Sequence, residues 1–182
     1  MAYGALGVYR WLSLSAVYEI IPQAQEEPIS VEPCFYAVIG GYKYAAGFGR
    51  SMYRINLQTH YRELYLQMPI FGVITDGEKL FFLTASDGTP GLLSYRPATG
   101  DMQAITNFID AAAGIRYQSG MIFYVDHTRR IRSVLTCGRP VATHRPTNVA
   151  AFDVRLPYLI FTQHDCDIEK EYNMNTGEIN FP

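Results

Sequence analysis

Two short polar segments carry the residue types that could do chemistry. Asp126 and His127 are adjacent in the first, and His164, Asp165 and Cys166 are consecutive in the second. A thiol, two imidazoles and carboxylates brought together could form a nucleophile–base pair or a metal site. However, their spacing matches no metal-ligand pattern, and no nucleophile motif such as G-x-S-x-G accompanies them. We therefore expect no metal, no cofactor and no catalytic residue, and keep a hydrolase-type enzyme as an alternative.

The acidic residues of these segments recur along the chain at a constant spacing. Asp87, Asp126 and Asp165 each follow an apolar run, and each is separated from the next by 39 residues. A glycine recurs with nearly the same spacing after the following apolar run, at Gly100, Gly138 and Gly177. An Asp that closes a hairpin commonly accepts hydrogen bonds from the backbone of its own loop. We expect this turn-stabilising role for all three carboxylates.

The stretch from Ile70 to Met102 shows the elements that must position these residues. Short apolar runs alternate in it with turn residues, which predicts four antiparallel strands. The pattern repeats upstream, where His60 stands in place of the turn glycine. We divide the chain, as one β-repeat domain, into units of residues 1–32, 33–69, 70–110, 111–147 and 148–182. The first has residues for about three strands only.

Units of about 39 residues with four strands resemble the blades of β-propellers. The resemblance implies an all-β fold, a small β-propeller of about five blades with the first one incomplete. A β-sandwich or barrel is the alternative, but even strand spacing alone does not make Asp and Gly return in register. The Trp-Asp and Gly-His signatures of WD40 repeats are absent, and the double glycine of kelch repeats occurs once, at Gly40-Gly41. No functional residues therefore transfer from a family.

Closure of such a ring depends on the incomplete first unit. We expect a compact ring in which the run from Leu6 to Leu14 packs against the last unit. The alternative is an open arc that another chain closes, in which case the protein would be an oligomer.

Composition limits the class of protein. The 182 residues, 48% of them hydrophobic, can bury the core of one domain, and the net charge of −2 gives no signal for nucleic acid or a membrane surface. We find no apolar run of membrane-spanning length. The cysteines Cys34, Cys137 and Cys166 are odd in number, unlike a secreted disulfide framework. We expect a soluble protein of a reducing compartment such as the cytoplasm.

One basic segment, from His127 to Arg145, contains no acidic residue. Its arginines are Arg129, Arg130, Arg132, Arg139 and Arg145. The last unit is acidic by contrast, with Asp165, Asp167, Glu169, Glu171 and Glu178. Either the two units pair across their boundary, or the guanidinium groups face a partner that carries carboxylate or phosphate. The segment lacks the aromatic platforms that single-stranded nucleic acid would need.

The main hypothesis is a non-enzymatic protein-interaction or assembly module, such as a structural subunit of a larger complex or virion. The candidate binding residues are Asp87, Asp126, His127, Arg129, Arg130, Arg132, His164 and Asp165. A carbohydrate-binding lectin, with an Asp and an aromatic platform repeated in each unit, is the second hypothesis. The third is the enzyme, which requires the loops of Asp126, His127, His164 and Cys166 to converge. The expected partner is thus a protein or a glycan.

Overall fold

The structure is a computed structural model that describes residues 34–86 and 88–181. This part of the chain is all-β, as expected, with one 3-10 turn, η1 (Ala111–Ala113), and no α-helix. Within it we find no helix long and apolar enough to cross a membrane. The three cysteines are described and none of them forms a disulfide.

The strands form three antiparallel sheets in which neighbours along the chain are neighbours in space. The first sheet has seven strands: β1 (Phe35–Ile39), β2 (Tyr42–Ala46), β3 (Arg50–Asn56), β4 (Arg62–Thr75), β5 (Leu80–Ser86), β6 (Thr89–Arg96) and β7 (Asp101–Asn107). The second has β8 (Ile115–Gln118), β9 (Met121–Val125), β10 (Ile131–Leu135) and β11 (Pro140–Thr143). The third has β12 (Val149–Arg155), β13 (Tyr158–Gln163), β14 (Cys166–Asn173) and β15 (Ile179–Asn180).

Strand β4 belongs to two four-stranded units at once. Residues from Arg62 to Leu66 pair with β3, those from Ile70 to Thr75 pair with β5, and Ile70 also pairs with Arg50 of β3. Pro69 lies between the two parts, where a residue without an N–H is tolerated. We name β1–β3 with the first part of β4 unit I, the rest of β4 with β5–β7 unit II, β8–β11 unit III and β12–β15 unit IV.

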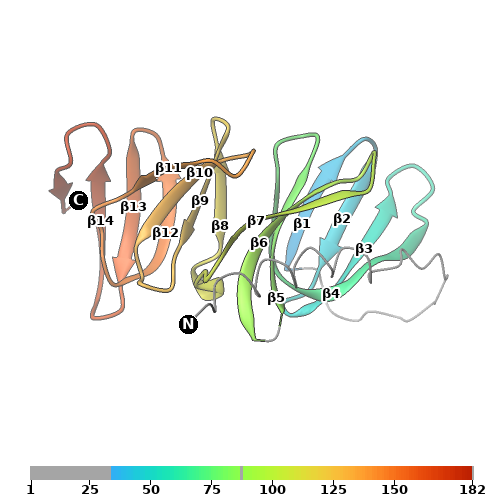
Figure 1. Cartoon of the computed structure of the whole chain (residues 1–182), viewed down its shortest axis with the longest axis horizontal. Coiled ribbons are helices and arrows are strands. Elements are labelled where there is room, and N and C mark those ends of the chain that lie inside the picture. The colour runs from blue at the N-terminus through green and yellow to red at the C-terminus, as the bar shows by residue number, and fades with distance from the viewer. Residues whose placement is uncertain (1–33, 87, 182) are drawn as a thin grey trace, which may run out of the picture.

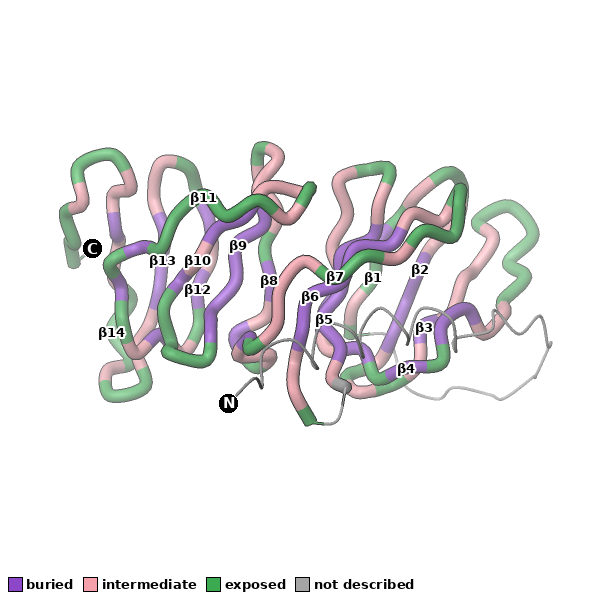
Figure 2. The backbone as a smooth tube through the Cα atoms, viewed as in Figure 1, coloured by how far each residue is buried: buried purple, intermediate pink, exposed green. Residues whose placement is uncertain are grey.

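The units stack face to face, and each interface is an apolar cluster. Phe82 and Leu80 pack toward unit I, whereas Phe81 and Leu83 pack toward unit III. In unit III, Phe123 packs toward unit IV. Successive side chains of a strand point to opposite faces, so a strand between two units is buried on both. This explains why the runs in β5 and β9 are continuously apolar instead of alternating (Figure 2).

The four units stand in a row, from β1–β3 at one end to β14 at the other (Figure 1). The first strands of successive units contact one another, β1 with β4, β4 with β8, and β8 with β12. Sheets that stack around adjacent first strands are arranged as propeller blades are. The predicted packing of Leu6 to Leu14 against the last unit lies outside the described residues.

The recurrent glycines occupy equivalent turns, as their spacing predicted. Gly100, Gly138 and Gly177 have positive φ values of 79°, 86° and 75°. His60 has a φ of 57°, and its amide donates to the carbonyl of Asn56 as that of Gly177 does to Asn173. The interpretation of His60 as a substitute for the turn glycine is therefore confirmed, at the cost of a strained residue.

Candidate functional site

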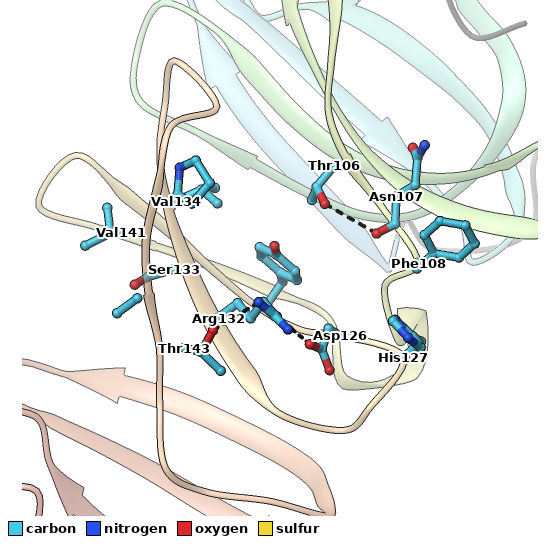
Figure 3. A pocket seen from close by; sticks show the side chains of 13 residues that line it. Thr106, Asn107, Phe108, Asp126, His127, Arg132, Ser133, Val134, Val141 and Thr143 are labelled. Carbon is cyan, nitrogen blue, oxygen red and sulfur yellow. Dashed lines mark hydrogen bonds and ion pairs between the residues drawn. The ribbon is translucent and has the colours of Figure 1, made fainter. Parts of the chain in front are cut away.

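A pocket of about 410 Å³ lies between units II and III (Figure 3). The outer strand β7 and the following Phe108 form one wall, and β9, β10 and β11 form the other. Tyr124 and Val134 are buried residues of its lining. The volume falls in the usual range of ligand pockets, and most of the lining surface is apolar.

Contacts between the units lie close to the pocket on two sides. At the turn of unit III, Gly138 lies next to Ile105 of β7, and a Cβ added to the glycine would be in ordinary van der Waals contact with Ile105 Cγ2, at 3.9 Å. Beyond the end of β7, the rings of Phe108 and His127 meet edge to face, with 5.7 Å between their centroids. The outer strands of two stacked units thus remain apart along a limited length, and the pocket fills that space.

Asp126 is the acidic residue in the lining, and its carboxylate is fully occupied. Oδ1 accepts from the Thr128 amide at 2.8 Å, the Thr128 hydroxyl at 2.5 Å and the Arg130 amide at 3.2 Å, and Oδ2 accepts from Arg132 Nε. Burial by itself would raise the pKa of Asp126, but hydrogen bonds, chiefly from Thr128 and Arg132, outweigh it and hold the pKa below its usual value. The predicted turn-stabilising role is confirmed for this residue.

Arg132 is held in place from two directions. Its Nε donates to Asp126, and its Nη1 donates to the Thr143 hydroxyl on β11 at 3.0 Å (Figure 3). The side chain nevertheless keeps 40% of its surface exposed, whereas that of Asp126 keeps 5%. The pocket therefore contains a guanidinium group with a defined orientation and access to solvent.

The two histidines singled out in the sequence have equivalent backbone roles. The amide of His127 donates to the carbonyl of Phe108 at 2.8 Å, and that of His164 donates to the carbonyl of Asn148 at 3.0 Å. Phe108 and Asn148 both have positive φ, and each lies on the connection leading into its unit. Each histidine thus ties its loop to that connection.

The loops of unit III and unit IV do not converge on the pocket. Asp126 and His127 line it, but His164, Asp165 and Cys166 do not. In the part of the chain that the structure describes, no three His, Cys, Asp or Glu side chains gather as a metal site would require. The arrangement needed for the enzyme alternative is therefore not observed there.

The other two recurrent acids behave differently from Asp126. Asp165 is exposed and accepts no hydrogen bond within its own loop, so the turn-stabilising prediction is wrong for it. Gln163 pairs with Cys166, so Asp165 lies within a two-residue turn, whereas Asp126 begins the longer loop between Val125 and Ile131 and accepts from two amides of that loop. Asp87 lies outside the described residues.

The basic segment does not form ion pairs with the acidic last unit in the described structure. Arg129 donates to the Asn148 side chain at 3.3 Å, and Arg145 donates to the Gly177 carbonyl at 3.2 Å. The described ion pair that joins units III and IV is instead Arg116 with Asp153 at 3.3 Å. Charge pairing across the boundary thus does not explain the arginine-rich segment.

Sequence reasoning missed a buried Ser–His pair. Ser133 Oγ and His144 Nε2 are 3.1 Å apart, and His144 lies between the rings of Phe123 and Tyr172. Burial lowers the pKa of His144. Both residues are buried in unit III, and the ring of His144 contacts Tyr172 of unit IV, so the pair lies at the packing boundary between these units.

Sequence reasoning also missed the apolar rim of the pocket, Phe108 and Val141. Both side chains are large and exposed, to 59% and 50%. The exposure of Phe108, at the end of one unit's outer strand, has no periodic signature. The only signal in the sequence was that Phe108 is an apolar residue next to turn-forming residues.

No protein-family model and no curated protein matches the sequence at a significant level. Three of the similar solved structures contain the N-terminal domain of Nup159, BamB from Moraxella catarrhalis and the nidogen/laminin complex. Their identities are 13%, 17% and 11%, each with a TM-score of 0.57. The match covers 78%, 78% and 79% of this chain, but 40%, 46% and 60% of theirs. Nup159 is also seen bound to S. cerevisiae Dbp5, at a TM-score of 0.56. The chain thus spans about half the length of these proteins, and its architecture is β-propeller-like.

Proposed function

We propose that the chain is a non-enzymatic protein-interaction module, with its docking site at the pocket between units II and III. The observation that carries the proposal is the combination of an exposed apolar rim, Phe108 and Val141, with the oriented guanidinium of Arg132. Protein interfaces characteristically combine large apolar anchors with a few fixed polar groups, among which Arg is enriched.

Similar structures support a scaffold role without identifying a partner. Nup159 occurs in a complex with Dbp5, and another similar structure is a complex of nidogen with laminin. Propeller-like folds serve many unrelated functions, so the fold alone does not identify a function.

A protein fits the site better than a glycan. A lectin of the expected kind would use its recurrent Asp to accept hydrogen bonds from sugar hydroxyls. All four donors that Asp126 accepts come from its own loop and from Arg132, so the carboxylate has little capacity left. The aromatic residue of the rim, Phe108, which a lectin would use as its platform, already contacts His127 edge to face.

We also propose that the complete architecture is a small propeller of about five blades, with residues 1–32 as an incomplete first blade. These residues lie outside the described part of the chain. What supports the proposal is the sequence repeat together with the outward surface of unit I, where Tyr36 and Val38 on β1 are 61% and 47% exposed. A further blade would cover this apolar surface.

A peptide-display library tests the docking site. Peptides selected on the wild-type protein would be measured on Ala142→Trp, which fills the pocket from β11, and on Ala104→Trp. Ala104 is also an exposed alanine on an outer strand, but it lies outside the lining. We expect selected peptides to bind Ala142→Trp at least tenfold more weakly and Ala104→Trp unchanged. If no selected peptide distinguishes the two variants, the pocket is not a docking site.

A further inference from the structure

We infer that the partner presents an acidic segment with one large apolar side chain, which enters the pocket while its carboxylates contact the arginines of unit III. This inference rests on the proposed function and specifies the chemistry of the partner. Four observations lead to it: the charge of the rim, the state of Asp126, the geometry of Arg132 and the apolar rim.

Charge on the unit III side of the pocket is positive. Arg132 lies on the side of β10 where Val134 packs toward unit II. Arg130 lies directly before β10 begins, next to the lining, and its amide donates to the lining residue Asp126. Arg130 is exposed, and no described ion pair involves it. The whole segment between His127 and Arg145 contains no acid.

Asp126 does not reverse this charge. Of the described residues in the lining it is the only acid, and its carboxylate is buried against Thr128 and Arg132. It therefore serves as an internal partner that orients the guanidinium, and it leaves the rim positive. A cationic partner would meet Arg132 in the lining, and Arg130 beside it, without an exposed carboxylate of the lining to compensate.

Arg132 retains capacity for an additional acceptor. Nε and Nη1 have partners in Asp126 and Thr143, and no described residue accepts from Nη2. Since two contacts already fix the side chain, a carboxylate bound at Nη2 would not have to restrict it further. A guanidinium held in this way favours carboxylate over neutral acceptors, because charge-assisted hydrogen bonds are stronger.

The apolar part of the partner is defined by the opposite rim. Phe108 ends the wall formed by unit II, and Val141 is exposed on β11, so an entering side chain would be enclosed by apolar surface from both units. Pro140 and Ala142 extend this surface along β11. A Phe or Leu between Asp and Glu residues satisfies both features.

Three synthetic peptides test the inference. The first has one Phe flanked by Asp and Glu, the second has Asn and Gln in place of the acidic residues, and the third has Lys in place of them. Fluorescence anisotropy would measure their binding to the full chain at low and at physiological salt. We expect the acidic peptide to bind at least tenfold more tightly than the neutral one and to weaken with salt. The Lys peptide should not bind measurably.

Variants assign the effect to unit III. Arg130→Glu should weaken the acidic peptide at least tenfold, whereas Arg155→Glu, the same charge change at an exposed residue of unit IV, should not. Arg132→Gln should also weaken binding, with its fold checked by thermal unfolding because Asp126 loses its partner. Equal binding of acidic and neutral peptides, or equal effects of the Arg130 and Arg155 variants, would overturn the inference and leave the docking site intact. If none of the three peptides binds Ala142→Trp more weakly than it binds the wild-type protein, the docking site itself is overturned.

Discussion

Asp126 connects the loop that carries His127 to the strand that carries Arg132. Its buried carboxylate accepts from Thr128 and Arg130 amides and from the Arg132 guanidinium. A buried carboxylate is tolerated only when such donors replace the lost water. The residue is therefore structural, although it lines the pocket.

Replacement of Asp126 by Ala should lower the free energy of unfolding by about 2–4 kcal/mol, because several part-buried donors, the Arg132 guanidinium among them, lose their acceptor. Asp165→Ala is the matched control from the next unit and should change it by less than about 0.5 kcal/mol. Urea unfolding at pH 7 measures both. Since the pKa of Asp126 is lowered, its contribution should disappear as the pH falls below about 4. Similar costs for the two variants would contradict the assigned role.

His144 gives the protein a second dependence on pH. Its pKa is lowered by burial between Phe123 and Tyr172, with Ser133 as its hydrogen-bond partner. The unfolded chain, whose His pKa is about 6.5, therefore takes up the proton more readily than the folded protein. Stability should be complete above pH 6.5 and should decrease as the pH falls below it.

The expected decrease is up to about 1.4 kcal/mol per pH unit between the two pKa values. His144→Gln keeps a polar side chain that does not titrate and should flatten this part of the pH profile. Urea unfolding between pH 5 and 8 makes the comparison. A wild-type slope in His144→Gln would assign the pH dependence to another group.

The site was only partly predictable from the sequence. The role of Asp126 followed from turn chemistry, which acts within a few residues. The backbone roles of His127 and His164 did not, because each depends on a carbonyl from a distant part of the chain, Phe108 or Asn148. The partnership of Arg132 with Thr143 depends on strand register, which a single sequence does not display.

The turns between the third and fourth strands show how elements keep their register from unit to unit. Each turn needs a residue with positive φ, and glycine adopts that conformation without strain. Around Gly100 no atom lies within 4 Å of an added Cβ, so a substitution there tests conformation alone. His60 is the exception, and it shows that a unit can form with a strained turn.

Gly100→Ala should destabilise the protein by about 1–2 kcal/mol, the usual cost of a left-handed conformation for a residue with a Cβ. His60→Gly should stabilise it by up to about 1 kcal/mol, because strain is relieved while the unfolded chain gains some freedom. Thermal unfolding of the two single variants gives both values. If His60→Gly is less stable than the wild type, the imidazole stabilises the folded protein by more than the backbone strain destabilises it.

Strands were easier to predict than sheets. The sequence shows the apolar runs of β5 and β9 and the turns between strands, because burial and turn formation depend on neighbouring residues. The continuity of β4 was not, because Pro69 reads as a boundary in sequence. In the structure the chain passes from one unit into the next there without leaving the sheet.

At the scale of the whole molecule, the described units form a row whose two end sheets face outward (Figure 1). The outward surface of unit I includes Tyr36 and Val38. The proposed five-bladed ring would cover it within the same chain, whereas an open arc would recruit another chain.

Light scattering should therefore give the mass of a single chain, 20.6 kDa, over a wide concentration range. Tyr36→Lys and Val38→Lys should destabilise the monomer if this surface is covered within the chain, but leave its mass unchanged. A stable mass of two or more chains that the Lys variants convert to one would instead identify the surface as an interface between copies and refute the closed ring.

The shared strand β4 has a consequence for how the protein opens. Units I and II are joined by a continuous backbone ladder on both sides of β4, whereas units II, III and IV meet mainly through side chains. Local opening that breaks β4 must expose amides of both units together. Native-state hydrogen exchange should accordingly give one common free energy of opening for the amides of β3 and β5. The amides of β9 and those of β13 should each give a different value. Independent exchange of β3 and β5 would show that the strand does not couple the two units.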